Sequence, residues 1–158
     1  MQTSSRPGWF KTAITGLLAL ALTVTANAAN VHFVGDPVFQ DTGENLDACF
    51  KLAGLGNKDI TVTLSVTGTA TVIYFNPGGN EPPGQNKVPI TAVTSKTIPA
   101  SEIKNGTVSV CLESPDVVVP PAPNENWVTE VQDVSFETAT ITVTQKGKTV
   151  LNQTFDLD

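Results

Sequence analysis

Histidine is almost absent from this sequence, which has one histidine among 158 residues. Because a Ser-His-Asp triad requires a general base, His32 is the only histidine available for that role. It lies near the start of the first expected strand, where a surface or edge-strand histidine is the simpler interpretation. The sequence also lacks a Walker loop, an HExxH pair and a CxxC pair. We therefore expect no enzyme, no bound metal and no cofactor, although a pair of carboxylates acting on a glycoside stays an alternative.

Basic residues are also scarce, with 9 lysines and arginines against 15 aspartates and glutamates. The acids are scattered, and this dispersed negative charge argues against nucleic acids and anionic membranes as partners. Four of them, Asp36, Asp41, Glu44 and Asp47, cluster between two early expected strands. Calcium takes oxygen ligands from such clusters, but the spacing of an EF-hand loop is missing. We interpret the cluster as a solvated acidic loop.

Long hydrophobic runs are limited to one, which spans residues 13–25 near the N-terminus. It is shorter than the roughly 20 apolar residues of a membrane-spanning helix. Arg6 and Lys11 precede it, and Ala26-Asn27-Ala28 follows it with small residues at the positions that signal peptidase reads. The pattern predicts a signal peptide over residues 1–28 and a single domain over residues 29–158; an uncleaved anchor is the alternative. We expect a secreted, extracellular protein, with retention in the cell envelope left open.

Helical periodicity is missing after residue 28, and two-residue alternation takes its place. Residues 60–67 and 138–145 alternate aliphatic side chains with threonine or serine, as in strands with one buried face and one wet face. About ten strand segments are expected, some of them parts of one bent strand: 31–34, 38–40, 46–52, 59–67, 69–75, 88–98, 106–112, 127–134, 138–145 and 148–157. This pattern predicts an all-β fold, an immunoglobulin-like antiparallel β-sandwich.

Turn residues support this topology at two places. Lys146-Gly147-Lys148 is expected to close a hairpin between the last two strands. Residues 98–106 are expected to form a corner between sheets, with one helical turn capped by Ser101 and with positive φ at Asn105-Gly106. The tyrosine that antibody domains carry two residues before the second cysteine is replaced by Ser109, so only the architecture is predicted.

Cysteine occurs twice, as Cys49 and Cys111, each within a strand-like segment. An even count in an exported chain predicts a disulfide, and a bridge between the two sheets is plausible. Two free thiols, or a metal pair, stay alternatives, although metal sites usually need more ligands than this sequence offers.

Two long loops remain, at residues 76–87 and 115–126, both rich in proline, glycine or asparagine. Exposed aromatic residues beside them would stack on a glycan or anchor a protein interface, and amides would add hydrogen bonds. The candidate binding surface consists of Tyr74, Phe75, Asn76, Asn80, Gln85, Asn86 and Trp127. The competing interpretation places the aromatic rings in the core and makes the amides turn formers.

The expected function is therefore a non-catalytic module that binds an extracellular protein or glycan. A structural or assembly subunit of a surface layer or filament is the alternative, because the terminal segment 149–157 could cross to a neighbouring molecule.

The segments GLGNKDITVTLSVTGTATV, NPGGNEPPGQN and IPASEIKNG lie within residues 54–106, about the middle third of the chain. This stretch resembles a group of small secreted bacterial proteins without assigned function, and the NPGGN-x-PPGQN loop is the most specific part of the resemblance. The resemblance implies a bacterial exported β domain. It implies no activity, ligand or functional residue.

Overall fold

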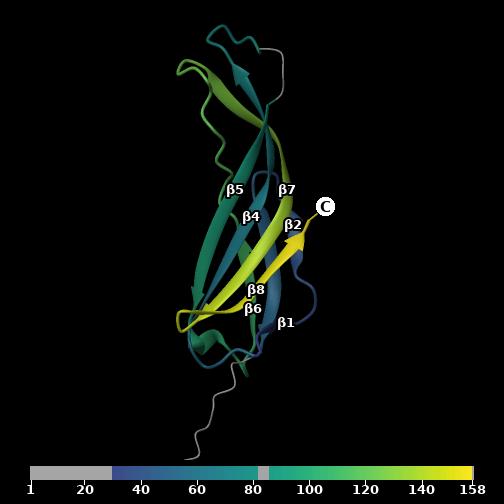
Figure 1. The fold of residues 1–158 in the computed structure, drawn as a ribbon, viewed down its shortest axis with the longest axis vertical. Coiled ribbons are helices and arrows are strands. Elements are labelled where there is room, and N and C mark those ends of the chain that lie inside the picture. Colours follow the sequence, from purple (N-terminus) through teal and green to yellow (C-terminus); the bar gives the residue numbers. More distant parts are fainter. Residues whose placement is uncertain (1–29, 82–85, 158) are drawn as a thin grey trace, which may run out of the picture.

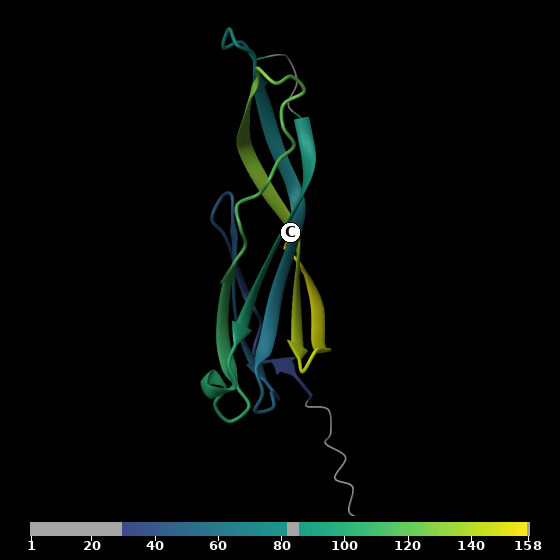
Figure 2. The same cartoon turned by 90° about the vertical axis from the view of Figure 1, so that its left-hand side faces the viewer.

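The computed structural model describes residues 30–81 and 86–157. The expected signal peptide and Gln85 lie outside these residues. Two antiparallel sheets pack against each other (Figures 1 and 2), and the only helix in the described part is a short 3-10 turn, η1 (Ala100–Glu102). The expected all-β sandwich is confirmed.

The first sheet is built around β3 (Leu46–Ala53). On one side, β2 (Val38–Asp41) pairs with the first half of β3 and the short β1 (His32–Phe33) pairs with its end. On the other side lies β6 (Val108–Glu113).

The second sheet is larger and has the order β5-β4-β7-β8. Its strands are β4 (Ile60–Phe75), β5 (Asn86–Ile98), β7 (Val128–Gln145) and β8 (Lys148–Asp156). The expected segments 59–67 and 69–75 are one strand, and so are 127–134 and 138–145. Irregularities in the β4–β7 register beside Gly68 and Val72 let these long strands bend without ending.

The core lies between the inner faces of the two sheets. In β4 every second residue is buried, and Leu64 is fully buried against Ile141 and other aliphatic side chains of the same cluster. The outer face of this sheet carries threonines, whose hydroxyls pair across strands, as between Thr140 and Thr154 at 2.8 Å. The alternation in the sequence therefore corresponds to one buried face and one wet face.

One side of the sandwich is closed by aromatic rings. Phe33 makes edge-on contacts with Phe50 and Phe155, each with ring centroids 5.5 Å apart. Phe39 also contacts Phe155, with centroids 5.3 Å apart. These contacts join β1, β2 and β3 to β8, which belongs to the other sheet.

The turns follow the expected residues with one exception. Lys146 and Gly147 both have positive φ, at 53° and 72°, and form a two-residue hairpin turn. Asn105 and Gly106 also have positive φ. The expected cap by Ser101 is wrong, because Ser101 lies inside η1 and the cap residue makes no side-chain hydrogen bond. Instead, a carboxylate oxygen of Asp59 accepts the Ala100 N–H bond at 2.8 Å.

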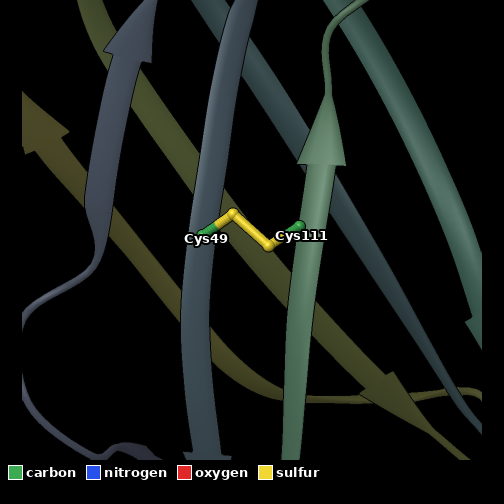
Figure 3. Close-up of a disulfide and its surroundings, with 2 residues drawn as sticks. All are labelled: Cys49 and Cys111. Carbon is green, nitrogen blue, oxygen red and sulfur yellow. A yellow bond between two sulfur atoms is a disulfide. The ribbon is translucent and has the colours of Figure 1, made fainter.

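The disulfide between Cys49 and Cys111 is confirmed, but its expected place between the sheets is wrong. The two cysteines face each other across the adjacent strands β3 and β6 of one sheet (Figure 3), with Cα atoms 4.2 Å apart. Both are exposed, because their neighbours in the strands, such as Phe50 and Val110, occupy the inner face. The bridge therefore staples the outer face of the smaller sheet.

Candidate functional site

The larger sheet extends well beyond the smaller one (Figure 2). We call this extension the arm; it consists of residues 68–75 of β4, 86–90 of β5 and 128–136 of β7. The arm keeps an apolar inner face that includes Ala70, Val72 and Val134, all of them buried. Because the smaller sheet does not reach this far, something else must cover that face.

The cover is an extended segment, residues 114–127, which we call the strap. It runs from the end of β6 along the arm to its far end (Figures 1 and 2). Val117 is buried in the same cluster as the inner face of the arm, and Val119 packs partly against it, whereas Val118 is 84% exposed. The strap is anchored at its start by Ser114, whose N–H donates to the Leu46 carbonyl at 2.9 Å. Side-chain burial thus holds a segment that belongs to no strand.

The aromatic residues of the candidate surface gather at the end of the arm, which we call the tip. Phe75 lies opposite Val128 in the β4–β7 ladder, and Trp127 directly precedes Val128. Tyr74 packs partly against the apolar core, whereas Phe75 and Trp127 are half-buried and do not belong to it. Val128 is 64% exposed. The tip therefore presents apolar and aromatic side chains contributed by two segments distant in sequence.

The amides at the tip shape its turns. Asn76 accepts hydrogen bonds at its side-chain oxygen from Gly78 N–H at 2.9 Å and from Asn80 N–H at 3.0 Å. Asn124, in the strap, orders the approach to β7, since its carbonyl accepts the Trp127 N–H bond at 3.0 Å.

Not every amide is used in this way. The side chains of Asn80 and Asn86 are exposed, and Asn86 lies opposite Val72 at the start of β5. Turn formation thus accounts for Asn76, whereas the exposed side-chain amides of Asn80 and Asn86 make no hydrogen bond to another described residue. Gln85 lies outside the described residues.

His32 is exposed on the short edge strand β1, and its Nδ1 lies 2.8 Å from the carbonyl oxygen of Asn30. Within residues 30–81 and 86–157, no three histidine, cysteine, aspartate or glutamate side chains gather in a group that could hold a metal ion. Asp41 instead accepts the Gly43 N–H bond at 2.8 Å and shapes the turn.

Two exposed residues of β7, Val128 at the tip and Asp133 farther along the strand, are not among the site residues expected from the sequence. Val131 and Val134 both face inward, although they are three residues apart. That spacing indicates a bulge at Gln132. The bulge reverses which side chains before it point inward.

No family model matches the chain, and no curated protein matches its sequence. Within the residues that the structure describes, no helix has the length and apolar character needed to cross a membrane.

Proposed function

We propose that this chain is an exported, non-catalytic binding module that contacts an extracellular protein or glycan through its tip. The observation that carries the proposal is the gathering of Phe75, Trp127 and the exposed Val128 at the end of a protruding arm, away from the apolar core. Large rings that are only half-buried offer apolar contact area at little cost in conformational freedom.

The surroundings of these rings suit a ligand with hydroxyl or amide groups. Asn80 and Asn86 expose their side chains close to them in the chain, and Asn76 holds the turn in one conformation. A preorganised turn lowers the entropic cost of binding. Export is supported by the basic and apolar N-terminal pattern and is compatible with the disulfide.

The proposal is tested on a glycan array with residues 29–158, followed by titration of the glycans that are retained. Trp127 is the only tryptophan after residue 28, so intrinsic fluorescence reports on the tip directly. We expect Trp127→Ala and Phe75→Ala each to weaken binding at least tenfold, as for hot-spot residues of about 2 kcal/mol.

Val93→Ala is the matched control, because Val93 is a 53% exposed valine on another part of the same sheet. Binding that survives both tip substitutions would show that the tip is not the site. If the array retains no glycan, the proposal turns to a protein partner. Binding of that protein should then be lost in the Trp127→Ala and Phe75→Ala variants.

The assembly role loses its main support in this fold. The terminal strand β8 pairs with β7 of the same chain over residues 138–145, so it is not held in reserve for a neighbouring molecule. Light scattering on a size-exclusion column at low and high concentration checks this point, and growing assemblies would favour the structural role.

A further inference from the structure

One edge of β7 lacks a neighbouring strand over half its length. β8 pairs with β7 only at residues 138–145, and the Leu157 N–H bond to the Glu137 carbonyl follows. Residues 128–136 of β7 pair with β4 on one side and, within the described residues, with no strand on the other. Figure 1 shows β8 stopping beside the middle of β7. Apart from the bulge at Gln132, the free edge offers backbone donors and acceptors in the spacing of a strand.

A groove runs along this edge, between β7 and the turn that joins β2 to β3. Near the end of β8, a cavity of about 150 Å³ is lined by the apolar side chains of Phe39, Leu46, Phe136 and Leu157. A second cavity, of about 210 Å³, continues it along Val131 and Val134. Asp41 lines both cavities, so they adjoin each other, and we call the two together the groove.

All the charged residues that line the groove carry the same sign. They are Asp41, Glu44 and Asp133, all exposed, and no lysine, arginine or histidine lines either cavity. Glu44 and Asp133 make no side-chain hydrogen bond to another described residue, whereas Gln132 donates to Glu130 at 2.8 Å. An occupant with positive charge would find its counter-charges at the rim of an otherwise apolar groove.

We propose that this groove binds an extended basic peptide segment of another protein, which adds to the free edge of β7 as an extra strand. Backbone hydrogen bonds to residues 128–136 would hold the segment, and alternate apolar side chains would enter the cavities beside Val131 and Val134. Lysine or arginine side chains would reach Glu44 and Asp133. Of the tip residues, only Val128 belongs to this edge, and the site goes beyond the proposed function.

A second copy of this chain is a poorer occupant. Pairing two β7 edges would bring Glu130 and Asp133 of both copies together in a protein whose residues after position 28 include seven basic and fifteen acidic ones. The same acids that oppose self-pairing select a basic segment.

The test uses a fluorescent peptide that alternates lysine with valine and is as long as residues 128–136. A matched peptide carries glutamate in place of lysine. Binding to residues 29–158 is followed by fluorescence anisotropy, and amide hydrogen exchange locates the site. We expect the lysine peptide alone to bind and to slow exchange within residues 128–136.

The double variant E44Q/D133N removes two rim charges without changing the apolar lining. It should weaken binding by about threefold to tenfold, as expected for two exposed ion pairs. The double variant D36N/E102Q makes the same change in net charge at exposed residues that do not line the groove, and it should leave the affinity unchanged.

Three outcomes would overturn the proposal. One is equal binding of the lysine and glutamate peptides. Another is protection that appears outside residues 128–136, for example at Phe75 and Trp127 of the tip. The third is slow exchange of residues 128–136 that depends on protein concentration without any peptide, which would make a second copy the occupant.

Discussion

Gly68 lies where the larger sheet leaves the sandwich and becomes the arm, opposite Phe136 of β7 and Ile90 of β5. A β-carbon at this position would overlap the carbonyl oxygen of Ser135 and approach the Cα atom of Phe136 to 3.0 Å. Both atoms belong to the backbone of a strand that is paired with β4 on both sides of the contact. Since neither atom can rotate away, the substitution Gly68→Ala must push two central strands apart.

We expect this substitution to lower the free energy of unfolding by about 3 kcal/mol, at the upper end of the range for overpacked cores. That is a large share of the roughly 5–15 kcal/mol that stabilises an ordinary domain. It corresponds to a fall in Tm on the order of 10 °C for a domain of this size.

Gly56→Ala is the matched control, because the atoms nearest to its β-carbon belong to the side chain of Gln145, at 3.3 Å, and not to the backbone. It should be neutral or stabilising by up to about 1 kcal/mol. Urea unfolding followed by circular dichroism measures both variants with the disulfide intact. A Gly68→Ala variant as stable as Gly56→Ala would refute the argument that β7 blocks this position.

Three further substitutions test other parts of the fold. Replacing Cys49 and Cys111 with alanine should cost about 4 kcal/mol by the chain-entropy model, because the bridge closes a loop with a sequence separation of 62; a loss below about 1 kcal/mol in urea unfolding would contradict it. Ser114→Ala should cost about 1–3 kcal/mol, because the buried hydroxyl accepts the Leu46 N–H bond at 2.9 Å; unchanged amide exchange at Leu46 would count against this. Gly147→Ala should cost about 1 kcal/mol, since φ is 72° there; an unaltered thermal melt would show that the turn tolerates a side chain.

The strands and turns could be predicted because each depends on local sequence. In β4 the alternation of apolar and hydroxyl residues determines which face of the strand is buried. In the last hairpin, Lys146-Gly147 determines the turn between adjacent strands. Alternation within a strand carries no information, however, about which strand lies alongside. The disulfide was therefore predicted correctly as a bond and wrongly as a link between sheets.

The candidate site could be predicted only in part for a similar reason. Tyr74 and Phe75 adjoin a long loop in the sequence, which is a local signal, and the structure brings Trp127 to the same end of the arm. The groove depends on where β8 stops along β7 and on how the β2–β3 turn faces Asp133. Both are long-range relations, which no local pattern encodes.

The position of the disulfide has a mechanical consequence. If the two ends of the chain are pulled apart, tension passes from β3 through the bridge into β6 and bypasses everything between them. The bypassed loop contains all of β4 and β5. Its contour length is about 200 Å, and the chain cannot extend by this length while the bridge is intact. A single-molecule extension trace should therefore gain this length only after reduction of the bridge, while β7 and β8 peel away first.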